Sequence, residues 1–123
     1  MNLCGARRKF LFLAILTLSG AVSAAEPRVI DLDVVRGEPK GGVKTVRVSK
    51  GDPVTLGVTA DVPLLVHIHG YEIELRTGAA GSGAKVRFDA RITGRFPVTA
   101  HIPAADGKKH TERTLLYLEV HPK

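Results

Sequence analysis

The sequence is poor in sulfur-containing residues. Its one cysteine, Cys4, and its one methionine, Met1, both lie at the N-terminus. A single cysteine cannot form a disulfide within the chain, so packing must hold the fold together, with or without a bound metal ion. Beyond residue 4 the chain has no thiolate or thioether to offer a metal. Sites that require sulfur ligands are therefore excluded there.

Aromatic residues and runs of one charge are also scarce. Tryptophan is absent, and aromatic residues make up 5% of the 123 residues. The core must therefore consist mostly of Val, Ile and Leu, which suits the packing of β-sheets. The charges are interspersed, without a basic run or an aromatic platform, so we expect no binding to nucleic acid.

The first 25 residues have the layout of a secretory signal peptide. Arg7, Arg8 and Lys9 precede an apolar run at 10–18, and mostly small residues follow up to residue 25. The apolar run is too short for a comfortable membrane span, so we expect a cleaved signal helix at 1–25 and one domain at 26–123. Removing the signal lowers the Lys and Arg count from 18 to 15 against 12 acids, and the net charge from +6 to +3.

The signal also indicates a destination. Arg7-Arg8-Lys9-Phe10-Leu11 resembles the core of bacterial twin-arginine signals, although Ala6 replaces the usual upstream Ser or Thr. The general secretory route and the twin-arginine route both stay open. Either route predicts a periplasmic or secreted protein of a bacterium, with no membrane association once the signal is cleaved.

The mature chain consists of short segments that alternate apolar and polar residues. Gly- and Pro-rich turns separate these segments at spacings of roughly ten residues, and no segment shows a helical period over three turns. This pattern predicts an all-β sandwich of seven or eight strands. The expected strands are 29–35, 43–48, 54–60, the stretch 64–72 with its continuation to 75, 84–90, 95–102 and 115–120.

Three places in this pattern lead to specific predictions. Residues 36–42 are expected to be a turn or loop, and residues 103–112 a polar loop that contains His110. Pro97 lacks a backbone donor, so the strand that contains it should have an edge or a bulge at that point.

The stretch Leu64 to Glu72 contains the most prominent candidate site. His67 and His69 are two residues apart in a strand-like run, so their side chains should share one face while Val66 and Ile68 share the other. At about 3.3 Å rise per residue, the two imidazoles start roughly 6.6 Å apart, close enough to ligate one metal ion.

Three motifs resemble the cupredoxin family, the Greek-key β-sandwiches of plastocyanin, nitrous oxide reductase and cytochrome oxidase subunit II. Residues 50–56 are similar to the Gly-Asp-x-Val-x-Leu strand of that family, and residues 69–73 to its His-Gly-aromatic stretch. Residues 94–100 are similar to the Gly-x-Tyr-x-x-x-Cys strand, and the strand at 116–120 also fits. The motifs occur in the family's order over most of the mature chain. The resemblance implies a Greek-key sandwich and places His69 at the first ligand position.

The sequence departs from that family at the position that matters for redox chemistry. Ala100 occupies the place of the ligand cysteine, Pro103 and Ala104 occupy the region of the second histidine, and no axial methionine exists. Blue copper requires two histidines and a cysteine, so electron transfer of that type is excluded. The closest resemblance is to cysteine-less, cupredoxin-like proteins of the bacterial periplasm.

The expected metal ligands are therefore His69, His67 and His101. His69 has the family position, His67 shares its face, and His101 lies on the strand expected to neighbour it. Such a set suits copper or, alternatively, zinc, with the fourth position open to water. The alternative is that the histidines are solvated or satisfied by neighbours and that no cofactor binds. Glu72 and Glu74 are expected to be exposed, or one of them to orient an imidazole.

Three classes of function follow from the sequence. The first is a secreted metal-binding module, and the second is a metal-free structural or protein-binding module with a periplasmic protein partner. The third is an enzyme of the dismutase or oxidase type, which would need more histidines than this chain has. We therefore expect no enzymatic activity.

Overall fold

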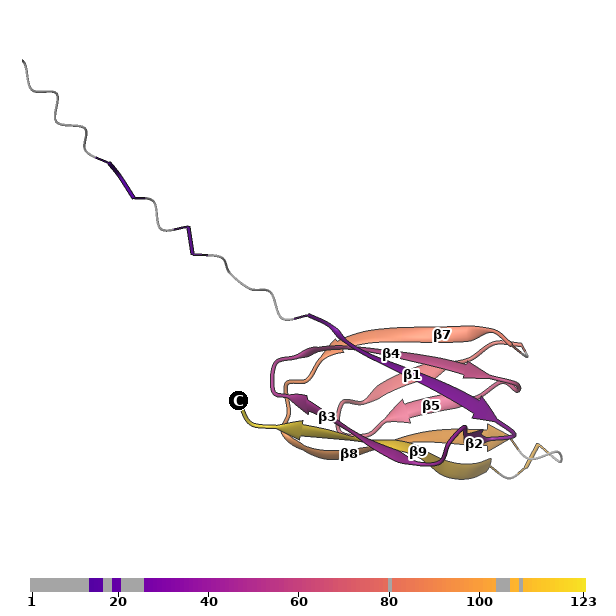
Figure 1. The fold of residues 1–123 in the computed structure, drawn as a ribbon. Coiled ribbons are helices and arrows are strands. Elements are labelled where there is room, and N and C mark those ends of the chain that lie inside the picture. The colour runs from indigo at the N-terminus through magenta and orange to yellow at the C-terminus, as the bar shows by residue number, and fades with distance from the viewer. Residues whose placement is uncertain (1–13, 17–18, 21–25, 80, 104–106, 109) are drawn as a thin grey trace, which may run out of the picture.

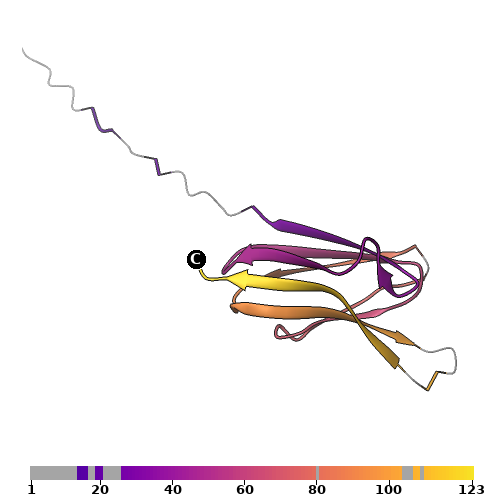
Figure 2. The ribbon, with the colours of Figure 1, turned by 60° about the horizontal axis from the view of Figure 1, so that its bottom comes forward.

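The computed structural model describes residues 14–16, 19–20, 26–79, 81–103, 107–108 and 110–123. Within them, nine strands form two sheets that pack face to face (Figures 1 and 2). The four-stranded sheet has the order β2-β1-β4-β7, with β1 at Arg28–Val35, β2 at Glu38–Pro39, β4 at Pro53–Ala60 and β7 at Gly83–Asp89. The five-stranded sheet has the order β3-β9-β8-β5-β6, with β3 at Lys44–Ser49, β5 at Leu65–Ile68, β6 at Ile73–Arg76, β8 at Gly94–Pro103 and β9 at His110–His121.

The chain crosses between the two sheets several times. After β1 and β2 it enters the five-stranded sheet as β3, returns as β4, and crosses again before β5, β7 and β8. As a result, β1 pairs with β4 and β3 pairs with β9 in parallel, while the other pairs are antiparallel. The predicted all-β, Greek-key sandwich is confirmed.

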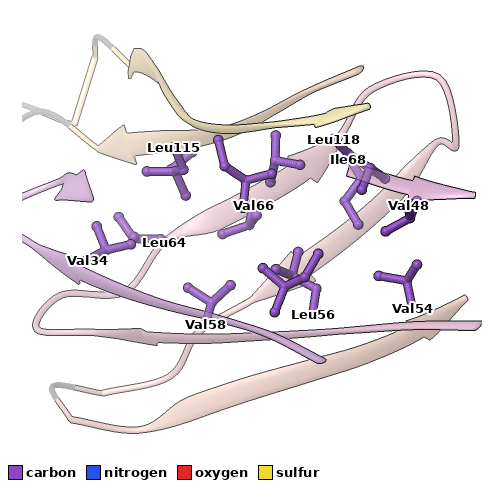
Figure 3. Close-up of a cluster of buried hydrophobic side chains, with 14 of the residues drawn as sticks. Val34, Val48, Val54, Leu56, Val58, Leu64, Val66, Ile68, Leu115 and Leu118 are labelled. Carbon is purple, nitrogen blue, oxygen red and sulfur yellow. The ribbon is translucent and has the colours of Figure 1, made fainter. Parts of the chain in front are cut away.

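The core lies between the sheets and is aliphatic (Figure 3). Val54, Leu56 and Val58 of β4 are 0–2% exposed and face Val66 and Ile68 of β5, which are both 0% exposed. Each such side chain contributes roughly 1.5–3 kcal/mol when it is fully buried. The fully buried set that the structure describes contains no aromatic residue, as the composition predicted.

The predicted strands are confirmed with three differences in detail. A two-residue strand, β2, lies within the predicted turn 36–42, and the division of the stretch 64–75 into β5 and β6 brings the total to nine. The predicted strand continuation after Gly70 is interrupted, because residues 69–72 form a turn and β6 begins at Ile73. The turn places Gly70 at a φ of 84° and Glu72 at a φ of 52°. Glycine adopts such a positive φ readily.

The third difference concerns the predicted polar loop at 103–112. Strand β9 begins at His110, and Thr111 and Glu112 pair with Ile102 and His101 of β8. The polar side chains of this segment misled the prediction, because the outer face of a sandwich strand can be polar throughout. Figure 2 shows β8 and β9 extending together beyond the other strands.

Pro97 lies in a central strand and not at an edge, since β8 is between β9 and β5. The predicted irregularity does occur, as a register shift between Val98 and Thr99. The predicted signal helix falls largely outside the described residues, and 14–16 and 19–20 have no regular secondary structure. In the described part of the chain, no helix is long and apolar enough to span a membrane.

Candidate histidine–carboxylate site

The site lies on the outer face of the five-stranded sheet, where β5 contributes His67. The neighbours Val66 and Ile68 point into the core, so His67 must point outward, and its side chain is 19% exposed. In the strand register, His67 lies opposite Thr99 of β8 on one side and Glu74 of β6 on the other. The predicted opposition of His67 to Val66 and Ile68 is confirmed, whereas His69 lies beyond the end of the strand.

His69 lies in the turn that joins β5 to β6. Its backbone N–H donates to the carbonyl oxygen of Pro97 at 3.1 Å, which ties the start of the turn to β8. The next residue, Gly70, packs so closely on Phe96 that an added Cβ would lie 2.3 Å from the ring. A glycine is therefore required beside His69 for both its φ and its contact.

Tyr71 anchors the other half of this turn. Its hydroxyl donates to the carbonyl oxygen of Ile92 at 2.8 Å and accepts from the Ile92 N–H at 3.1 Å. The ring packs against Phe96 and Phe88, with centroids 5.1 and 5.2 Å away. These contacts fix the backbone that presents His69 and Glu72.

The two imidazoles are in contact. The ring centroids of His67 and His69 are 4.3 Å apart and the planes are tilted by 51°. Their side chains are 19% and 37% exposed, so both are partly open to solvent. The structure thus brings together the two histidines that the sequence pattern singled out.

Thr99 and Glu112 hold one nitrogen of His69. The Nε2 atom lies 2.9 Å from the Thr99 hydroxyl oxygen and 3.1 Å from Oε1 of Glu112. The Thr99 hydroxyl also hydrogen-bonds Glu112, and this bond, followed by that to His69, lowers the pKa of the Glu112 carboxyl. The carboxylate is therefore kept ionised, and an ionised carboxylate only accepts hydrogen bonds.

Glu72 faces His67 from the turn. Its Oε2 atom lies 3.7 Å from Nε2 of His67, which is too long for a hydrogen bond. The Glu72 side chain is 82% exposed. Glu74 is also exposed, so the expectation that both glutamates face solvent is confirmed.

His101 is on the same outer face but does not join the pair. It lies opposite Leu65 of β5 and Glu112 of β9, diagonal to His67 across the β5–β8 pair. Diagonal neighbours in a sheet have Cα atoms about 7–8 Å apart, and His69 is farther along the chain. Among the residues that the structure describes, no three His, Cys, Asp or Glu side chains are grouped so that they could hold a metal ion.

Ala100 points away from the histidines. It pairs with Val66, and both side chains are 0% exposed between the sheets. A ligand at position 100 would lie on the opposite face of the sheet from His67. The residue type and the direction of its side chain both separate this site from a cysteine-containing copper centre.

The network does not form a nucleophile–base–carboxylate relay. Such a relay requires the hydroxyl and the carboxylate to contact opposite nitrogens of the imidazole. Here Thr99 and Glu112 contact the same nitrogen, Nε2. This arrangement can orient a ring, but it cannot pass a proton from the hydroxyl through the ring to the carboxylate.

The remaining histidines lie elsewhere. His121 ends β9, where its Nε2 lies 2.8 Å from Oε1 of Glu119, and it is exposed. His110 begins β9 instead of lying in a loop. Glu112 was the functional candidate that sequence reasoning missed, because it is 43 residues from His69 and was assigned to a loop. Residues 110–114 are all polar, so no alternation with apolar residues marks this part of the chain as a strand.

Comparison with known proteins identifies the fold. No protein-family model matches the sequence, and no curated protein matches it. A solved heme-copper terminal oxidase dimer contains a similar chain, with a TM-score of 0.57 and 17% identity over 89% of this chain and 80% of that one.

Two copper enzymes contain similar domains. A blue copper oxidase from Nitrosomonas europaea has a TM-score of 0.53 at 20% identity over 80% of this chain. A copper-containing nitrite reductase from Thermus scotoductus SA-01 has a TM-score of 0.55 at 17% identity, also over 80% of this chain. The chain spans 40% and 28% of the lengths of these two proteins. At such identities the likeness concerns the fold, and these neighbours share the cupredoxin fold. The chain therefore forms a cupredoxin-like β-sandwich.

Proposed function

We propose that this protein is a secreted, cupredoxin-like module that binds copper, or alternatively zinc, through His67 and His69. It would store the ion or hand it over, without the electron-transfer chemistry of blue copper and without catalysis. The signal-like N-terminus supports the secreted location. The contact between the two imidazoles, with centroids 4.3 Å apart on a partly open face, is the observation that carries the proposal.

The donor atoms of this face suit such an ion. Imidazole nitrogens bind both copper and zinc, and carboxylates complete many zinc sites. Two ligands bound at about 2.0–2.2 Å to one ion lie about 3–3.5 Å apart. The 3.7 Å between Nε2 of His67 and Oε2 of Glu72 is close to that spacing. Glu72 is therefore a candidate oxygen ligand, and a bound ion would supply positive charge between these groups.

His101 enters the proposal as a third imidazole. Its side chain would have to rotate toward His67, because the two residues are diagonal neighbours across β5 and β8. A His101→Ala variant tests this role separately from the pair. If His101 is a ligand, its loss should weaken binding by the same order as the loss of His67.

The test is metal retention by the purified protein. After incubation with Cu(II) or Zn(II) and gel filtration, we expect one ion per chain in the wild type and none in the His67→Ala/His69→Ala double variant. His121→Ala is the matched control, since it removes an exposed histidine from the same sheet and should retain the ion. A dissociation constant weaker than about 10 μM would overturn the proposal.

A metal-free structural or protein-binding module is the second candidate. It is favoured by the lack of a three-ligand group among the described side chains. A ligand that binds only the folded state at 100 times its dissociation constant adds about 2.7 kcal/mol of stability. For a domain of this size, that raises the melting temperature by roughly 10–20 °C. Equal melting temperatures with copper, zinc and chelator would support the metal-free module.

A further inference from the structure

We propose that Glu112, together with Thr99, is a positioning residue that holds the His69 ring with its proton on Nε2 and leaves Nδ1 as the metal-binding nitrogen. The part that concerns the metal rests on the proposed function. The part that concerns the ring does not, because it follows from hydrogen bonds in the metal-free protein.

The donors and acceptors around Nε2 of His69 determine where its proton lies. An ionised carboxylate has no proton to donate, so Oε1 of Glu112 at 3.1 Å must accept from Nε2–H of His69. The Thr99 oxygen at 2.9 Å can share that proton while its own hydroxyl donates to Glu112. All three groups are then satisfied with one assignment of protons.

The assignment decides which nitrogen remains open. A neutral imidazole carries one proton, so a protonated Nε2 leaves the lone pair on Nδ1. A metal on Nε2 would have to displace both Thr99 and Glu112, whereas a metal on Nδ1 leaves both contacts intact. Carboxylates in this position generally orient a ligand imidazole and increase its basicity.

The location of Glu112 makes this contact dependent on the β8–β9 pair. Thr99 comes from β8 and Glu112 from β9, and their strands meet beside the register shift at Val98/Thr99. His69 comes from the turn after β5, which Pro97 and Tyr71 hold in place. Three separate parts of the fold therefore determine one ring orientation.

The first experiment reads the proton position without metal. Long-range ¹H–¹⁵N correlation spectra of the metal-free protein, recorded in mild alkali, should show His69 entirely as the Nε2–H tautomer. In Glu112→Ala the Nδ1–H tautomer should appear beside it, as in free imidazole. Glu112→Gln, which keeps an accepting oxygen, should restore most of the Nε2–H form. A wild-type Nδ1–H tautomer, or no change in Glu112→Ala, would overturn the inference.

The second experiment reads metal affinity. Loss of an orienting carboxylate typically weakens metal binding about 10–100-fold, which we expect for Glu112→Ala with Cu(II) or Zn(II). Glu119→Ala is the matched control, because it removes one carboxylate from the same strand, where Glu119 contacts Arg47 and His121. Its affinity should stay within about 2-fold of wild type.

The two experiments separate the two proposals. If no variant, including the wild type, binds metal while the tautomer shifts as expected, the proposed function fails and the positioning role stands. If wild type and Glu112→Ala bind metal equally and the tautomer does not shift, the positioning role fails and the metal-binding function stands.

Discussion

Replacing Gly70 with alanine should destabilise the fold and disturb the turn that carries His69. At φ 84°, an alanine pays the steric cost of the left-handed region, about 1–2 kcal/mol, offset in part by its lower entropy in the unfolded chain. The added Cβ would also lie 2.3 and 2.5 Å from two ring carbons of Phe96, against about 3.5–4.0 Å for an ordinary contact.

Phe96 cannot easily move away from this clash. Tyr71 packs against its ring at 5.1 Å between centroids, and the space at Gly94 beside the ring is also tight. Overpacking of this kind costs about 1–3 kcal/mol, so the total for Gly70→Ala is about 2–4 kcal/mol. For a domain of this size, each kcal/mol lowers the melting temperature by about 4–8 °C.

Gly42 provides a matched control. It also has a φ of 84°, but an added Cβ there would meet nothing within 4 Å. Gly42→Ala should therefore cost only the backbone part, about 1 kcal/mol. Denaturant unfolding of both variants isolates the contact with Phe96 as the difference between them. Equal free energies of unfolding would refute the packing argument.

Two further predictions concern the sheet around the site. In Ala100→Cys, we expect no intense blue copper absorption and a thiol that is protected from thiol reagents, because residue 100 is 0% exposed in the core. A blue colour after copper addition would contradict the assigned direction of this side chain. The lowered pKa of Glu112 means that its carboxylate stabilises the folded state above the ordinary value of 4.5 and that this stabilisation is lost as pH falls through the lower folded-state pKa. The stability difference between wild type and Glu112→Gln, measured by denaturant unfolding, should therefore be largest near neutral pH and shrink below pH 4.5; a difference independent of pH would show that the carboxylate charge is not responsible.

The fold was predictable because most strands have one buried and one solvated face. Along β4, Val54, Leu56 and Val58 are buried, and their spacing of two residues is visible in the sequence. The places where a strand ends within an alternating segment were less visible. Tyr71 continues the alternation and does pack against the core, but the backbone turns at Gly70. Periodicity reports which side chains are buried, and it does not report whether the chain runs straight between them.

The site was only half predictable for a related reason. The contact between His67 near the end of β5 and His69 in the turn that follows involves residues only two positions apart, which is local information. The contact of His69 with Glu112 depends on the β8–β9 register and on the irregularity at Val98/Thr99. No spacing within the sequence specifies which residue of a distant strand reaches a given ring. His101 shows that a shared face does not by itself produce a contact. It lies on the same face as His67, but its partner on β5 is Leu65.

The two faces of one sheet explain how this chain keeps a cupredoxin-like fold without a thiolate copper site. Residue 100 faces the core, so a substitution there alters core packing. His67 and Glu112 face outward, so substitutions at these residues alter the core little. Because side chains alternate along a strand, a single substitution at position 100 cannot reach the histidines; a shift of one residue in register would be needed, and it would expose the whole apolar face. The outer-face site is thus separable from the fold. Variants at His67, His69 and Glu112 should alter the proposed metal binding with small changes in stability. Variants at Val66 or Ala100 should lower stability with small changes in metal affinity.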